Sequence, residues 1–163
     1  MPSVRCTIVE LCAFKRTENG PLYLILKRSP NESLYPDLWQ IVTGRIRKGE
    51  TAKAAALREL REETRLSPER TWIAPVVGSF FNLADDCVEM CPLFAVEVAS
   101  GAEPVLSKEH REYEWASFER AEALLVWPGH HDAVRVVRDY IVTESEAARL
   151  TEIKQGSKER KKK

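Results

Sequence analysis

The chain has 163 residues, with 25 basic and 25 acidic side chains that give a formal net charge of zero. This length favours a single domain with a sizeable hydrophobic core. Hydrophobic residues make up 44% of the sequence, but no apolar run reaches the roughly 18 residues of a membrane-spanning helix. The N-terminal residues also lack the basic start and apolar stretch of a secretory signal. We therefore expect a globular cytoplasmic protein without a membrane span.

The first part of the chain predicts strands separated by turn-forming residues. A turn is expected at residues 17–21, and a loop with two prolines at residues 29–37. A helix is expected over the charged segment after residue 50, with Pro68 helping to end it. Apolar and β-branched residues predict strands at residues 4–14, 22–27 and 38–43.

The second part predicts further strands followed by two helices. Apolar residues recur at helical spacing over residues 131–142, and His130 and His131 are expected to mark the start of this helix. A shorter helix is expected at residues 118–125. Strands are expected at residues 72–81, 88–98 and 114–116. This alternation predicts an α/β (α+β) fold in which a mixed sheet lies between helices.

Four cysteines are present, at positions 6, 12, 87 and 91, and none forms a Cys-x-x-Cys pair. Buried, reduced thiols are the favoured interpretation, and a four-cysteine zinc site is the alternative. Reduced thiols are typical of the cytoplasm. The basic residues at 158–163 suggest nucleic-acid binding, but a short basic run at a chain end more often forms a solubilising tail. We therefore do not expect a nucleic-acid partner.

Carboxylates are crowded in the segment that follows Gly44. Glu59, Glu62 and Glu63 fall within about one helical turn and share one polar sector of the predicted helix. Such crowding destabilises a helix unless a cation lies among the side chains, and Mg²⁺ prefers oxygen ligands of this kind. Arg58 and Glu50 are predicted to pair and to brace these ligands. The alternative is a solvent-exposed helix rich in arginine and glutamate.

The spacing in this segment resembles the signature of Nudix hydrolases. Gly44 is followed by five residues and Glu50, then by seven residues and the run RELREE, residues 58–63. The departure is Arg65, because the family pattern has glycine at this helix end, where a left-handed C-cap is normal. The resemblance implies an α/β/α sandwich over residues 1–143. A helical extension and a basic tail, expected to be partly disordered, would follow at residues 144–163.

The resemblance also implies a magnesium-dependent hydrolase of phosphoanhydrides, with Mn²⁺ as an alternative ion. It implies metal ligation by the Gly44 carbonyl and by Glu59, Glu62, Glu63 and Glu109. Catalytic roles fall to Arg58, Glu59, Glu62 and Glu109, and the general base is left open among the three glutamates.

A narrower resemblance is to the branch that hydrolyses dihydroneopterin triphosphate. Two segments carry it: residues 38–44, LWQIVTG, and the Glu109-His110 pair. In that branch the glutamate of the pair supplies a distal metal ligand or base, and we expect His110 to be a structural hydrogen-bonding residue.

Substrate contacts are predicted at residues near these motifs. Arg28, Arg45 and Arg47 are candidates for phosphate binding. Trp39, Phe80 or Phe81 could stack on a flat heterocycle.

Three functions compete at this point. The first is hydrolysis of a nucleoside or pterin triphosphate with release of pyrophosphate. The second is hydrolysis of a dinucleoside polyphosphate or nucleotide sugar. The third is a nucleotide-binding module without catalysis, which the intact acidic residues oppose. The expected partner is a small polyphosphate substrate, and the protein is expected to be a monomer or a homodimer.

Overall fold

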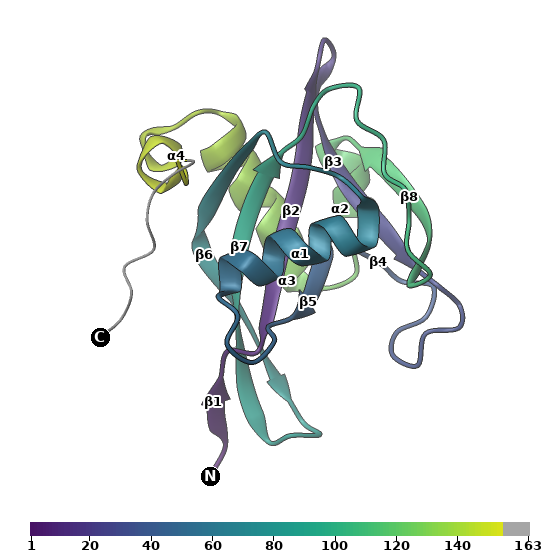
Figure 1. Cartoon of the computed structure of the whole chain (residues 1–163), viewed down its shortest axis with the longest axis vertical. Coiled ribbons are helices and arrows are strands. Elements are labelled where there is room, and N and C mark those ends of the chain that lie inside the picture. Colours follow the sequence, from purple (N-terminus) through teal and green to yellow (C-terminus); the bar gives the residue numbers. More distant parts are fainter. Residues whose placement is uncertain (155–163) are drawn as a thin grey trace.

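The computed structural model describes residues 1–154, which form one eight-stranded sheet with helices on both faces (Figure 1). The strand order is β1-β7-β2-β3-β4, with β5 beside β2, β6 beside β7 and β8 beside β3. Strand β2 pairs in parallel with β7 and antiparallel with β3, so the sheet is mixed as predicted. The strands are β1 Ser3–Arg5, β2 Ile8–Thr17, β3 Gly20–Arg28, β4 Trp39–Gln40, β5 Val42–Arg45, β6 Arg70–Asn82, β7 Cys87–Glu97 and β8 His110–Ala116. The helices are α1 Ala52–Thr64, α2 Phe118–Leu124, α3 Pro128–Val136, the π-helix η1 Val137–Val142 and α4 Glu146–Thr151.

Two hydrophobic cores lie on opposite faces of the sheet, because alternate residues of a strand point to opposite sides. On one face, Leu11 of β2 packs in a buried cluster with Leu60 of α1. On the other face, Phe14 of the same strand packs in a cluster with Val134 of α3 and Ile141 of η1. Helix α1 therefore covers one face and helix α3 the other (Figure 1). This arrangement is the predicted α/β/α sandwich.

Several element boundaries differ from the predictions. The strand expected at residues 4–14 is interrupted at Cys6 and Thr7, where buried Glu89 accepts hydrogen bonds from the Thr7 amide and hydroxyl. The strand expected at residues 38–43 is divided at Ile41 into β4 and β5. Strand β8 begins at His110, four residues earlier than predicted, because its pairing with β3 extends to His110 opposite Arg28.

The segment after residue 143 packs on the domain. Ala148 of α4 is buried in the core cluster that also contains Ile141 of η1, and Glu152 forms an isolated β-bridge with Trp72. The Arg70 guanidinium donates to the Glu152 carboxylate at 2.8 Å. The predicted basic tail at residues 158–163 lies outside the described residues. Within residues 1–154, no helix has the length and apolar character needed to cross a bilayer.

The cysteines are free thiols, as predicted. Cys12, Cys87 and Cys91 are buried, but Cys6 is exposed, so the prediction of burial was wrong at that position. Cys6 lies in the short break between β1 and β2.

Candidate functional site

The site is built where strand β5 leads into helix α1. Thr51 caps the helix, and its hydroxyl accepts from the Ala54 amide at 3.2 Å. The Arg47 amide donates to the Glu50 carboxylate at 3.0 Å, which closes the loop before the cap. The predicted helix and its start are therefore present, and the loop presents Glu50 toward the helix.

Gly44 allows the Glu59 side chain to lie directly against the strand. A Cβ atom added to Gly44 would lie 2.1 Å from both Cγ and Cδ of Glu59, a distance that no real side chain tolerates. The sheet register explains the contact, because Gly44 pairs with Val9 and faces α1. Glycine at this position therefore serves a close approach between strand and helix.

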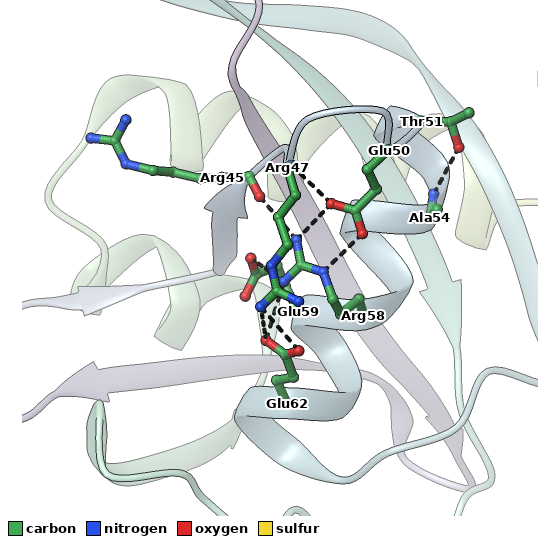
Figure 2. Close-up of polar contacts among 8 residues, drawn as sticks. All are labelled: Arg45, Arg47, Glu50, Thr51, Ala54, Arg58, Glu59 and Glu62. Atoms are coloured by element: carbon green, nitrogen blue, oxygen red, sulfur yellow. Dashed lines mark hydrogen bonds and ion pairs between the residues drawn. The ribbon is translucent and has the colours of Figure 1, made fainter.

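Arg58 joins the loop to the helix through one guanidinium group (Figure 2). Its Nε and Nη2 donate to the two carboxylate oxygens of Glu50, each at 2.8 Å. Nη2 also donates to the Arg45 carbonyl at 2.9 Å, and Nη1 to Glu59 and Glu62 at 2.7 and 3.1 Å. The hydrogen bonds from Arg58 to Glu50, together with the one from the Arg47 amide, lower the pKa of Glu50 to about 2. The expected Arg58–Glu50 pair is present.

Glu63 is the most deeply buried carboxylate of the helix, with an exposed fraction of only 3%. Its Oε2 atom has no hydrogen-bond partner among the described residues. Burial raises its pKa well above the ordinary value, and the nearby charges of Glu59 and Glu109 raise it further. Placing a buried carboxylate among other carboxylates is unfavourable without a neutralising charge.

The predicted distal carboxylate, Glu109, reaches the site through backbone contacts at the end of α1. The Val105 amide donates to the Thr64 carbonyl at 2.8 Å, and the Ser107 amide donates to the Glu63 carbonyl at 3.0 Å. These bonds fix the segment before β8 against the helix end. Burial raises the pKa of Glu109, as do the charges of Glu32 and Glu59.

This donor set fits a hard divalent cation. Carboxylate and carbonyl oxygens are the ligands that Mg²⁺ prefers, and such an ion would neutralise the charge of the buried Glu63 carboxylate. In residues 1–154, however, no three acidic, histidine or cysteine side chains already converge into a metal cluster. In Figure 2, Arg58 contacts Glu59 at 2.7 Å, and Arg47 contacts the two oxygens of Glu62 at 3.0 and 3.2 Å. An ion would have to displace part of these ion pairs.

Three of the predicted substrate residues are arginines with different surroundings. The Arg28 guanidinium donates to Glu32 at 3.0 Å and to the Leu34 carbonyl at 2.9 Å, and its charge offsets part of the rise in the pKa of Glu63. Arg47 lies over the helix carboxylates, whereas the Arg45 side chain extends away from them (Figure 2).

The predicted aromatic residues do not gather with the carboxylates. Trp39 packs on the core at the α3 face, opposite to α1, and the Lys27 ammonium lies 5.4 Å from its ring centroid. Phe80 and Phe81 are exposed on β6, in the stretch that pairs with the start of β7.

An aromatic pair that sequence reasoning missed lies near the loop after β3. The Tyr35 and Trp127 rings meet edge to face, with centroids 5.0 Å apart, and both are partly exposed. Tyr35 has a positive φ of 52°, which is rare for a bulky residue and is typical of a constrained loop. A bridge between Trp39 and Leu125 brings the chain near Trp127 to the same edge of the sheet. In the sequence, an aromatic residue in a proline-containing loop is the indication of this pair, and it is a weak one.

Comparison with known proteins identifies a family. The NUDIX domain model matches residues 7–140. The octanoyltransferase of Myxococcus xanthus is 32% identical over 119 residues, which cover 69% of this chain and 31% of that protein. This chain thus spans about a third of the length of the curated relative it matches.

Solved structures agree on the fold. A candidate NUDIX hydrolase from Listeria monocytogenes is 27% identical with a TM-score of 0.69, covering 82% of this chain and 92% of that one. An Ap4A hydrolase from C. elegans is 20% identical with a TM-score of 0.68, covering 82% and 96%. The E. coli dihydroneopterin triphosphate pyrophosphohydrolase is 21% identical with a TM-score of 0.67, covering 89% and 100%. At 20% and 21% identity, the last two likenesses concern the fold alone.

The family model spans the whole segment from Gly44 to Glu63 in which the acidic site is built. The chain therefore belongs to the Nudix family.

Proposed function

We propose that this Nudix family member is a hydrolase, a Mg²⁺-dependent pyrophosphohydrolase with Mn²⁺ as an alternative ion. Its proposed substrate is a nucleoside triphosphate or a pterin triphosphate such as dihydroneopterin triphosphate. Water adds to a phosphorus atom, the bridging P–O bond breaks, and pyrophosphate leaves. Cytoplasmic location is part of the proposal, and the four free thiols support it.

The observation that carries the proposal is the surroundings of Glu63. This carboxylate is buried, its Oε2 is unpartnered, and the charges of Glu59 and Glu109 act on it. Together with the Gly44 carbonyl and Glu62, these side chains are the proposed metal ligands. A bound divalent ion would neutralise charge on phosphate oxygens and make a water molecule more acidic.

The chain's own groups have separate tasks in this scheme. Arg58 and Glu50 hold the ligand carboxylates in place through the hydrogen bonds of the guanidinium. Glu59, Glu62 or Glu109 accepts the proton of the attacking water as general base. Arg28 and Arg47 bind the phosphates, for which each must exchange a carboxylate partner for a phosphate oxygen.

The substrate class follows from the groups beside the acidic site. We propose that Tyr35 and Trp127 contact the flat heterocycle, because both rings are partly exposed and Tyr35 lies in the loop that follows Arg28. The segment LWQIVTG at residues 38–44 and the Glu109-His110 pair, which resemble the dihydroneopterin triphosphate branch, favour a pterin. The alternative substrate is a dinucleoside polyphosphate or a nucleotide sugar.

The test is a hydrolysis assay on the purified chain. We expect Mg²⁺-dependent release of pyrophosphate from dihydroneopterin triphosphate or from one of a panel of nucleoside triphosphates. Products would be separated by chromatography. Cleavage restricted to dinucleoside polyphosphates or nucleotide sugars would contradict the proposed substrate in favour of the alternatives.

Glu63→Gln tests the metal site directly. We expect the fold to persist and turnover to fall by roughly a hundredfold or more, because the buried ligand charge is lost. Glu18→Gln is the matched control, since Glu18 is exposed at the turn between β2 and β3. An unchanged rate in Glu63→Gln would remove Glu63 from the metal site.

A further inference from the structure

A buried polar chain lies behind Glu63, on the side away from solvent. It consists of Gln40 on β4, His110 at the start of β8 and Glu63 on α1, with exposed fractions of 7%, 4% and 3%. Gln40 Nε2 lies 3.2 Å from His110 Nε2. On the other side of the ring, His110 Nδ1 lies 3.9 Å from Glu63 Oε2.

The two facing atoms are both without a hydrogen bond. His110 Nδ1 and Glu63 Oε2 are buried side-chain atoms with no partner among the described residues. Buried polar atoms are almost always paired, so two unpaired atoms that face each other require an explanation. Their separation exceeds hydrogen-bond distance by less than 1 Å. A small shift of either side chain would therefore join them.

The contact with Gln40 determines which nitrogen of His110 carries the proton. An amide nitrogen can only donate, so His110 Nε2 must accept from it. A neutral imidazole that accepts at Nε2 carries its proton on Nδ1. That N–H is then directed toward the acceptor Oε2 of Glu63.

We propose that Gln40 and His110 are positioning residues that fix the tautomer and orient the Glu63 carboxylate toward a divalent cation. The proposal rests on the proposed function, because it assigns Glu63 to the metal. When Glu63 ligates an ion through its other oxygen, the Nδ1–H of His110 donates to Oε2 and the gap of 3.9 Å closes. Hydrogen bonds to the outer atoms of metal ligands commonly orient them in this way.

Other groups near Glu63 do not provide this hydrogen bond. The charge of Arg28 offsets part of the rise in the Glu63 pKa, but its guanidinium donates to Glu32 and to the Leu34 carbonyl. Glu59 and Glu109 carry like charges and can only repel an ionised Glu63. The imidazole is thus the donor that the fold places against Oε2.

Two amide substitutions at position 110 separate the roles of the two ring nitrogens. In His110→Asn the amide nitrogen can occupy the position of Nδ1 and donate to Glu63. In His110→Gln the longer side chain places its amide near the position of Nε2 and leaves Glu63 without a donor. Both variants remove the ring and leave a neutral amide, so they are matched controls for each other.

The measurement is calorimetric titration of the full chain with Mn²⁺ alone, with thermal melting as a check on folding. We expect His110→Gln to weaken Mn²⁺ binding by roughly tenfold to a hundredfold, and His110→Asn by no more than about threefold. The proposal would be overturned if His110→Gln and His110→Asn bound Mn²⁺ with equal affinity, whether that affinity matched the wild-type value or was weaker in both. Absence of Mn²⁺ binding by the wild-type chain would instead overturn the proposed function, and this inference with it.

Nitrogen-15 NMR of the imidazole provides a second readout that does not depend on metal. We expect His110 in the wild-type chain to be the Nδ1–H tautomer, and Gln40→Leu to mix the two tautomers. A wild-type His110 with its proton on Nε2 would contradict the assigned orientation, whatever the affinity results.

Discussion

At the scale of single residues, Gly44 and Arg65 show two different backbone requirements at the ends of the same site. Gly44 is required for space, because the Glu59 side chain occupies the volume where a Cβ would lie. Arg65 instead occupies a conformation that glycine favours, with φ 60° and ψ 7° at the C-cap of α1. The requirement for space at Gly44 concerns the acidic site, because it sets the position of Glu59. The conformation at Arg65 concerns only the end of the helix, and a residue other than glycine adopts it.

Gly44→Ala should reduce turnover strongly and leave the fold largely intact. The added methyl group must displace the Glu59 carboxylate, since the clash distance is 2.1 Å. A displacement of about 1 Å at a catalytic group can cost on the order of a hundredfold in rate. Gly101→Ala is the control, because nothing lies within 4 Å of its added Cβ. Steady-state kinetics and circular dichroism of both variants test this, and full activity in Gly44→Ala would contradict it.

Arg65→Gly should stabilise the protein. An L-residue in the left-handed region costs roughly 1–2 kcal/mol, whereas glycine enters it freely at some cost in unfolded-state entropy. The cap itself would persist, because the Arg65 amide donates to the Arg61 carbonyl at 3.0 Å through the backbone. We expect a net gain of up to about 1 kcal/mol in the free energy of unfolding in urea. A loss of stability would indicate that the Arg65 side chain makes a compensating contact.

At the scale of elements, the loop of residues 46–50 and helix α1 act as one unit. Arg58 reaches from the helix to both oxygens of Glu50 and to the carbonyl of Arg45. The Ile46 amide donates to the Thr7 carbonyl at 2.8 Å, which ties the loop to the chain before β2. The loop is thus held from two sides, and its arginine contact also orients Glu59.

Arg58→Lys should loosen this unit although the charge is kept. A lysine ammonium cannot reproduce the planar fork that binds both oxygens of Glu50 and neighbouring acceptors at once. We expect turnover to fall by roughly tenfold to a hundredfold, and amides of residues 46–50 to exchange faster with deuterium. Arg61→Lys on the exposed side of the same helix is the control. Unchanged exchange in Arg58→Lys would contradict the bracing role.

The same elements show what could be predicted from sequence. Helix α1, its cap and the Arg58–Glu50 contact follow local spacing, so one sequence suffices to expect them. The contacts of His110 with Gln40 and Glu63 depend on β8 pairing with β3, which joins residues far apart in the chain. The Tyr35–Trp127 pair likewise depends on loop placement. The spacing of apolar residues along the chain does not indicate which distant segments pair with each other.

At the scale of the whole molecule, a second pair of buried ionisable groups lies on the sheet face opposite to α1. Glu10 of β2 and His130 of α3 are both buried, with Oε1 and Nε2 3.6 Å apart. Burial raises the pKa of Glu10 from 4.5 to about 7 and lowers the pKa of His130 from 6.5 to about 4. Both groups are therefore neutral in the folded protein over much of the pH range between 4 and 7.

These two shifts act on stability with opposite signs. Between pH 4.5 and 7 the folded state keeps a proton on Glu10 that the unfolded chain has lost, so stability falls as the pH rises. Between pH 4 and 6.5 the unfolded chain binds a proton on His130 that the folded state excludes, so stability rises with pH. In the wild-type chain the two contributions largely cancel where the ranges overlap.

Single substitutions should expose each contribution. In Glu10→Gln only the histidine contribution remains, so stability relative to wild type should fall by about 3 kcal/mol as the pH drops through the overlapping range. In His130→Asn the relative stability should instead rise by a similar amount over the same change. Urea unfolding from pH 7 down to 4.5 measures both differences, and subtraction from wild type removes the other titrating groups. If both variants lost stability together near pH 5.5, Glu10 and His130 would form a charged pair, and the opposed slopes derived from burial would be wrong.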